Sequence, residues 1–87
     1  AAGAVESAED AYFHEQMADE IEAARKALCR ERIAKVKALL TVKQYRRIWM
    51  YLAEGKSITE IARAEGLSKA SVSRSIAAAL RKLCKLR

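Results

Sequence analysis

Two glycines, each followed two residues later by a serine, divide the second half of this chain into three helical segments. Glycine tolerates the left-handed backbone that ends a helix, and serine caps the first turn of the next one. Gly55 with Ser57 and Gly66 with Ser68 therefore predict two short turns between three helices, and Thr41 predicts the N-cap of the first of these helices. The chain has no proline and only three glycines in 87 residues, so little else interrupts helix formation.

The composition around these turns favours an all-α fold. Alanine, leucine, lysine, arginine and glutamate dominate, and clusters of the β-branched residues that favour strands are missing. An apolar stripe at spacings of four and three predicts one helix over about residues 7–29. We expect a small helical bundle of four to five helices, with a joint near residues 29–32, and residues 1–6 frayed or left over from cloning. The stripe consists of Phe13, Met17, Ile21, Ala24 and Leu28.

Residues 58–76 fit the spacing of a helix-turn-helix motif. Such a motif needs a small residue midway along its first helix, because the second helix crosses close to it, and Ala62 meets this need. It also needs a residue that tolerates positive φ in the turn, and Gly66 stands four residues later. Val72, six positions further on, supplies the apolar residue of the second helix. We therefore expect residues 30–87 to form one domain with a helix-turn-helix at its C-terminal end.

The outward positions at the start of the second motif helix are candidates for contact with bases. The helix, about residues 68–85, is expected to enter a DNA major groove with its N-terminus first. Arginine forks onto the O6 and N7 atoms of guanine, which makes Arg74 the strongest candidate. The five candidates for base contact are Lys69, Ala70, Ser71, Ser73 and Arg74.

A second set of polar residues flanks the motif helices, where a strand of the DNA backbone is expected to pass. Hydroxyl groups, basic side chains and the amides at a helix N-terminus bind phosphate without reading sequence. The six candidates for phosphate contact are Arg46, Arg47, Lys56, Ser57, Thr59 and Ser68.

Charge is divided unevenly along the chain. Residues 1–20 carry six acids and no lysine or arginine, whereas residues 21–87 carry 17 basic and five acidic residues, a net charge of +12. A basic body favours a polyanionic partner, and we expect double-stranded DNA. A further hypothesis is that the acidic head, residues 1–20, lies over the basic body, residues 21–87, until a partner displaces it. Deleting residues 1–20 would then tighten DNA binding.

The sequence offers little for catalysis or metal binding. His14 is the only histidine, and Cys29 and Cys84 form no Cys-x-x-Cys motif, so we expect no metal and no cofactor. No nucleophile–base pair or phosphate-cradling glycine loop is present, so we do not expect an enzyme. Reduced cysteines fit a cytoplasmic protein. No apolar run approaches the roughly 20 residues of a membrane span.

Over about residues 30–87 the sequence resembles region 4 of the bacterial sigma-70 family. It is most similar to the short sigma-like proteins of Gram-positive bacteria, phages and conjugative elements. The resemblance implies a four-helix fold, recognition of a −35 promoter element and docking on the flap of the RNA polymerase β subunit. It also places Lys69, Ala70, Ser73 and Arg74 on the base-reading face. The matching segments are residues 40–41 (LT), 44–47 (QYRR), 54–62 (EGKSITEIA), 65–68 (EGLS), 71–76 (SVSRSI) and 79–83 (ALRKL).

The chain departs from that family at two points. Where Ala70 stands here, housekeeping sigma factors carry an acidic residue that accepts a hydrogen bond from cytosine. Alanine cannot do so, and we therefore do not expect the housekeeping −35 sequence as the target. The aromatic-rich helices that melt the −10 element are absent from these residues. We therefore expect a fragment of a longer factor, a regulator, or a protein that acts with a partner.

Two other functions remain open at the level of sequence. The first is a dimeric LuxR-like helix-turn-helix regulator, in which the apolar stripe of residues 7–29 pairs two chains, and a palindromic target would favour it. The second is a protein-interaction module that binds RNA polymerase or an anti-sigma factor without DNA, in part through residues 7–29. Weak, salt-insensitive DNA binding would favour the second.

Overall fold

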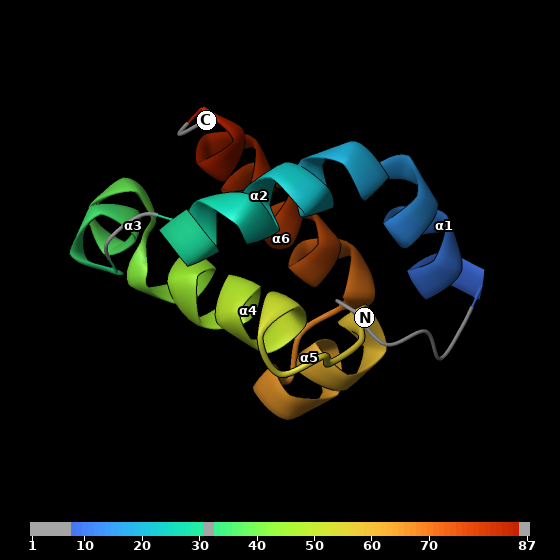
Figure 1. Cartoon of the computed structure of the whole chain (residues 1–87). Helices are drawn as coiled ribbons and strands as arrows, with labels where there is room; N and C mark the ends of the chain where they lie inside the picture. The colour runs from blue at the N-terminus through green and yellow to red at the C-terminus, as the bar shows by residue number, and fades with distance from the viewer. Residues whose placement is uncertain (1–7, 31–32, 86–87) are drawn as a thin grey trace.

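The computed structural model describes residues 8–30 and 33–85, and these residues form helices without any strand (Figure 1). The all-α prediction is confirmed, but the described residues contain six helices rather than four to five. The expected frayed segment, residues 1–6, lies outside the described residues. The helices are α1 (Ala8–Gln16), α2 (Ala18–Arg30), α3 (Ile33–Leu39), α4 (Val42–Leu52), α5 (Ile58–Glu65) and α6 (Lys69–Cys84).

The helix boundaries in the second half of the chain lie where the capping residues predict them. Thr41, Ser57 and Ser68 are the N-caps of α4, α5 and α6, and each side chain accepts a hydrogen bond from the amide three residues later. Gly66 ends α5 in the left-handed region with φ of 66°, and Gly55 follows α4 with φ of 69°. Local sequence therefore determines these boundaries.

Helix α6 is the centre of the fold. It crosses behind α2 in Figure 1 and packs against α2, α4 and α5. Its inward side chains, Val72, Ile76, Leu80 and Leu83, are completely buried. Burying a side chain of this size stabilises the fold by about 1.5–3 kcal/mol. The buried side chains hold one side of α6 in the core, and the residues on the opposite side of the helix therefore face a fixed direction.

The N-terminal helices belong to the same core as the rest. Met17, Ile21 and Ala24 are buried, as their spacing predicts, and they pack in one cluster with the side chains of α4, α5 and α6. The described part of residues 30–87 therefore shares its core with residues 17–28 rather than enclosing a separate one.

The single helix predicted over residues 7–29 is wrong, because the chain bends at Met17. Met17 keeps a hydrogen bond to each helix: its amide donates to the Phe13 carbonyl at 3.0 Å, and its carbonyl accepts from the Ile21 amide at 2.8 Å. Tertiary packing accounts for the bend. Phe13 meets the ring of Tyr51 on α4 edge-on, with centroids 5.9 Å apart, whereas α2 lies along α6.

The joint expected near residues 29–32 falls on residues 31 and 32, which lie outside the described residues; α2 is described to Arg30 and α3 from Ile33. Cys29 and Cys84 do not form a disulfide, and the Cys84 thiol donates to the Glu20 carbonyl at 3.7 Å. Among the described residues no cluster of histidine, cysteine and acidic side chains has the make-up of a metal site. The same residues contain no helix with the length and apolar character needed to span a bilayer.

Candidate nucleic-acid interface

Three residues connect α5 to α6, and their bonds fix the turn. The amides of Gly66 and Leu67 both donate to the carbonyl of Ala62, the latter at 2.9 Å. Ala62 is 4% exposed and Val72 is completely buried, so both lie inward as their spacing predicts. The sequence predicts that Leu67 and Ile61 fill the space between the two helices. Ile61 is buried there, but Leu67 is 40% exposed on the outside of the turn.

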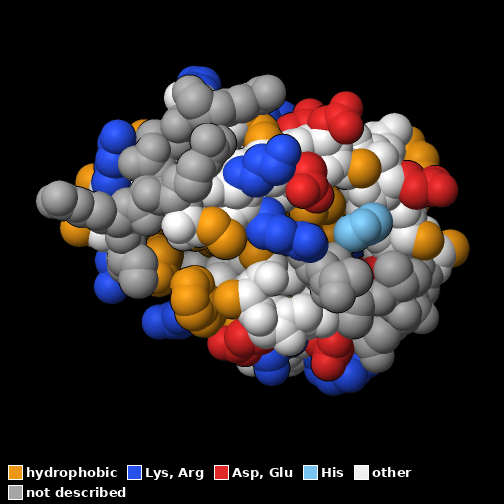
Figure 2. Space-filling model, viewed as in Figure 1, with side chains coloured by type: hydrophobic (Ala, Val, Ile, Leu, Met, Phe, Trp, Pro, Cys, Tyr) orange, Lys and Arg blue, Asp and Glu red, His pale blue; other side chains and the backbone are white. Residues whose placement is uncertain are grey.

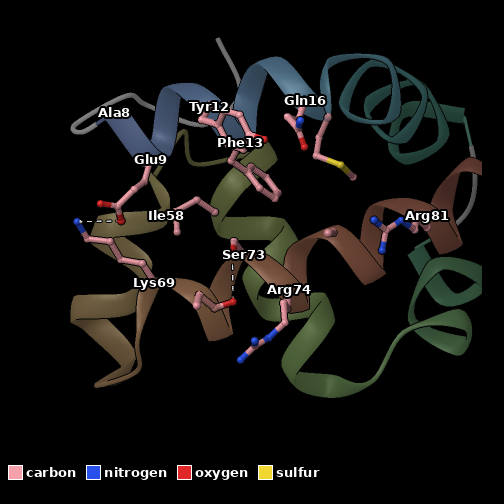
Figure 3. A pocket seen from close by; sticks show the side chains of 13 residues that line it. Ala8, Glu9, Tyr12, Phe13, Gln16, Ile58, Lys69, Ser73, Arg74 and Arg81 are labelled. Atoms are coloured by element: carbon pink, nitrogen blue, oxygen red, sulfur yellow. Dashed lines mark hydrogen bonds and ion pairs between the residues drawn. The ribbon is translucent and has the colours of Figure 1, made fainter.

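The start of α6 presents an outward strip that we call the open face of α6: Lys69, Ala70, Ser73 and Arg74. Ala70 and Arg74 are exposed, and Lys69 and Ser73 are half-buried. Figure 3 shows the Arg74 guanidinium extending away from the helices into open space. Because Val72 and the next apolar residues anchor the opposite side, this strip has a fixed direction.

The serines of this region make only local hydrogen bonds at the surface. The hydroxyl of Ser68 donates to that of Ser71 at 3.0 Å and accepts from the Ser71 amide at 3.1 Å. The hydroxyl of Ser73 donates to the carbonyl of Ala70 at 3.1 Å. Bonds of this kind exchange with water, so the three hydroxyls can still reach a ligand.

Two of the six predicted phosphate contacts are occupied inside the protein. Arg47 has a side chain only 13% exposed; its Nε donates to Glu65 at 2.6 Å and its guanidinium donates to Ser75 at 2.9 Å. It therefore bridges α4 to α5 and α6. Ser57 is completely buried, with its hydroxyl accepting from the Glu60 amide at 3.0 Å. Because both side chains are engaged inside the protein, neither is positioned to bind a phosphate.

The other predicted phosphate contacts lie at or near the surface. Arg46 and Ser68 are exposed. Lys56 is half-buried, with its ammonium 3.8 Å from Glu54. Thr59 is half-buried and, unlike the others, is covered by a residue of α1.

Two acids of α1 contact residues of the candidate interface. The carboxylate of Asp10 accepts from the Thr59 amide at 3.3 Å and from the Thr59 hydroxyl at 3.0 Å, and Asp10 is only 2% exposed. The carboxylate of Glu9 lies 3.6 Å from the Lys69 ammonium (Figure 3). Sequence reasoning missed these pairs, although the concentration of acids in residues 1–20 pointed to the segment that provides them.

A groove of about 770 Å³ separates α1 from α6, and we call it the α1–α6 groove. Its walls are largely apolar, and Figure 3 shows Tyr12, Phe13 and Gln16 of α1 on one side and the open face of α6 on the other. The residues that line it are Ala8, Glu9, Tyr12, Phe13, Gln16, Met17, Ile58, Lys69, Ala70, Ser73, Arg74, Ala77 and Arg81.

A second groove, of about 400 Å³, lies between α3 and α4, and we call it the α3–α4 groove. The rings of Tyr45 and Trp49 stack there with centroids 6.2 Å apart, and the ammonium of Lys37 lies 5.2 Å from the centre of the Tyr45 ring. Trp49 is 40% exposed and Val42 is 76% exposed. These aromatic residues form the rim of the fold, whereas Tyr51 is part of the core, as expected.

The Tyr51 hydroxyl lies beneath α1. Burial raises the pKa of Tyr51 to about 12, and the carboxylate of Asp10 adds to the increase. The hydroxyl is 3.4 Å from Nδ1 of His14. The ionisation state of this buried phenol therefore depends on the same helix that contacts the candidate interface.

The face of the molecule over α2 and α4 carries both signs of charge. Figure 2 shows lysine and arginine side chains interspersed with acidic ones there, with the histidine among them. This face does not offer one continuous basic surface to a polyanion. No family model, curated protein or solved structure gives a significant match to the chain.

Proposed function

We propose that the chain is a sequence-specific DNA-binding transcription regulator of the sigma region 4 type. In this proposal α5 and α6 form the helix-turn-helix, and the open face of α6 contacts base edges in the major groove. The observation that carries it is the arrangement of α6: Val72 and Ile76 hold one side in the core, and Ala70 and Arg74 face outward. A helix held this way presents the same side chains to every site that it meets.

Arg74 is the principal base contact in this proposal. Its exposed guanidinium can donate two parallel hydrogen bonds to the O6 and N7 atoms of one guanine. Lys69 and Ser73 stand beside it and can add contacts to neighbouring bases. Ala70 carries no acceptor for the amino group of cytosine, so the preferred site differs from the one that housekeeping sigma factors read.

Phosphate contacts position α6 in the proposed complex. Arg46 and Ser68 are exposed, and Lys56 follows the turn before α5. Each phosphate that a basic side chain neutralises releases counterions, so the affinity falls as salt rises. The proposal includes RNA polymerase as a partner on the strength of the resemblance alone.

Selection of binding sites from random DNA tests this function. The purified chain is presented with a pool of random duplexes, with and without bacterial RNA polymerase, at about 50 and about 200 mM salt. We expect a short enriched motif that contains a guanine, and an affinity that falls by orders of magnitude between the two salt concentrations. Recovery of no motif in either condition would contradict the proposal.

A protein-interaction module is the second candidate, and the α3–α4 groove favours it. Val42 and Trp49 leave apolar surface exposed there, and Lys37 and Arg46 add positive charge at its edge. Exposed aromatic and arginine side chains are enriched at protein interfaces. Salt-insensitive, weak DNA binding together with capture of polymerase would favour this candidate over the first.

A dimer paired through the apolar stripe of residues 7–29 finds no support in the packing. Met17, Ile21 and Ala24 are buried within the chain itself. A LuxR-like dimer would have to use another surface.

A further inference from the structure

We propose that α1 is an internal competitor of DNA, which holds the interface closed until the helix swings away at Met17. This inference rests on the proposed function. The inference concerns how DNA binding at the open face of α6 is regulated. Two carboxylates of α1 occupy positions that DNA phosphates would take, and α1 itself lies beside the open face.

Asp10 occupies the N-terminal end of α5 as a phosphate group would. Its two oxygens accept from the amide and the hydroxyl of Thr59, at 3.3 and 3.0 Å. The amides at a helix N-terminus and the positive end of the helix dipole favour an anionic oxygen at this point. Because Asp10 is 2% exposed, nothing else can approach these donors while it is in place.

Glu9 acts in the same way on α6. Its carboxylate lies 3.6 Å from the ammonium of Lys69, which belongs to the open face. The two side chains are 69% and 41% exposed, so the pair is weak by itself. The pair matters because of where it lies: the Lys69 ammonium cannot bind DNA while it is paired with Glu9.

The width of the two helices adds a steric conflict. Tyr12, Phe13 and Gln16 form the wall of the α1–α6 groove that faces Ser73 and Arg74 (Figure 3). A helix with its side chains is about 10–12 Å across, and the major groove is about 12 Å wide. One helix fills that width, so α6 cannot reach the base edges while α1 stands beside its open face.

The attachment of α1 allows it to move without unfolding the protein. The bend at Met17 separates α1 from α2, and Ile21 and Ala24 of α2 remain deep in the core. Apart from its two acids, α1 is held by the edge of Phe13 against Tyr51 and by the approach of His14 to the same hydroxyl. Release of α1 therefore exposes the rings of Phe13 and Tyr51, while the core that α2 shares with α6 stays buried.

A matched pair of double variants tests this regulation. Glu9→Gln with Asp10→Asn removes the two contacting charges, and Glu15→Gln with Asp19→Asn removes two exposed acids of the same head that make no contact with the interface. Both pairs raise the net charge equally. The probe is a fluorescein-labelled duplex pool of random sequence, titrated with each full-length protein at about 50 and about 200 mM salt.

We expect the first pair to bind at least about fivefold more tightly than the parent, a coupling at the low end of the usual range. The second pair should change the affinity less than about twofold, because distant exposed charges are screened. Circular dichroism and thermal melting establish that each variant is folded. Equal tightening by both pairs would mean that the head acts only through its net charge, and the proposal would fall.

Hydrogen exchange in the parent protein provides a second, mutation-free test. Adding the duplex pool should speed amide exchange in residues 8–16 while exchange at the start of α6 slows. Unchanged or slower exchange in α1 would overturn the proposal, because α1 would then stay in place or join the complex. If the parent and both variants fail to bind the duplex at either salt concentration, the proposed function itself is wrong; if all bind alike, only the regulation is wrong.

Discussion

Gly66 shows how much one residue contributes to the turn between α5 and α6. Its φ of 66° lies in the left-handed region, and a Cβ added there would meet no other atom within 4 Å. The cost of a side chain at this position is therefore the cost of the backbone conformation alone. We expect Gly66→Val to lose about 2 kcal/mol, because β-branched residues tolerate this region least.

Thermal or urea unfolding measures this effect, and Gly66→Asn is the matched control. Asparagine visits the left-handed region more readily, so it should lose clearly less than valine. A valine variant that melts like the parent would remove the basis for the turn assignment.

The buried phenol of Tyr51 makes stability depend on pH at the alkaline end. Its pKa is raised from 10 to about 12 by burial and then by Asp10. The unfolded chain loses this proton first, so the stabilisation is complete below pH 10 and is lost as pH rises toward about 12. Two pKa units correspond to about 2–3 kcal/mol. As pH rises from 10 to 12, the free energy of unfolding should therefore fall less in Tyr51→Phe than in the parent.

Absorbance of the tyrosinate near the same pH values provides the check. The parent should show one component that ionises late, near pH 12, and Tyr51→Phe should lack that component. A late component that survives in the variant would assign the raised pKa to another tyrosine.

Arg74 has the largest expected effect on recognition among single side chains. Arg74→Ala should lose about 1–3 kcal/mol of binding free energy on the selected site and relax the preference at one base position. Lys26→Ala, which removes an exposed positive charge on α2, should lose much less. Equal losses by Arg74→Ala on all sequences would show that this arginine touches only phosphate.

At the scale of helices, the capping residues made the sequence most informative. Thr41, Ser57 and Ser68 predict the starts of α4, α5 and α6, because a cap is a local hydrogen bond between a side chain and a nearby amide. The bend at Met17 was not predictable, since helical hydrogen bonds continue on both sides of it. The packing of Phe13 on α4, a contact between distant parts of the chain, decides it.

The N-caps of α4 and α5, Thr41 and Ser57, each form a capping box with the residue three positions later, and the two boxes should contribute differently to stability. Ser57 is completely buried, whereas Thr41 is exposed. Loss of the Ser57 hydroxyl leaves the partly buried Glu60 amide without its acceptor, whereas the Gln44 amide at the exposed cap can turn to water. Ser57→Ala should therefore lose about 2 kcal/mol of stability and Thr41→Ala about 0.5–1 kcal/mol. Urea unfolding of the two variants compares them. The reverse order would contradict the burial of the α5 cap.

Arg47 illustrates what the sequence could not reveal about the candidate site. An arginine near a predicted motif has the chemistry of a phosphate contact, yet here it joins Glu65 and Ser75 across three helices. Those partners lie 18 and 28 residues away, and no local pattern specifies them. Side chains whose direction follows from helix periodicity, such as Val72 and Arg74, were placed correctly inward and outward.

At the scale of the whole molecule, the split in charge between residues 1–20 and the rest corresponds to a physical contact. The sequence reveals that residues 1–20 are acidic and the rest of the chain is basic. It does not reveal which residues of the two parts are in contact. The structure places Asp10 on Thr59 and Glu9 beside Lys69. Those contacts follow from the shared core of α2 and α6, which positions α1 next to the open face.

The central claim is that the open face of α6 enters the major groove, and an exchange map on the selected duplex tests it most directly. Amide hydrogen exchange is measured across the full chain with and without that duplex. The account predicts slower exchange at residues 57–60 and 68–77, with any change within residues 37–54 confined to the surroundings of Arg46. Slower exchange confined to residues 37–54, the segment of the α3–α4 groove, would contradict it.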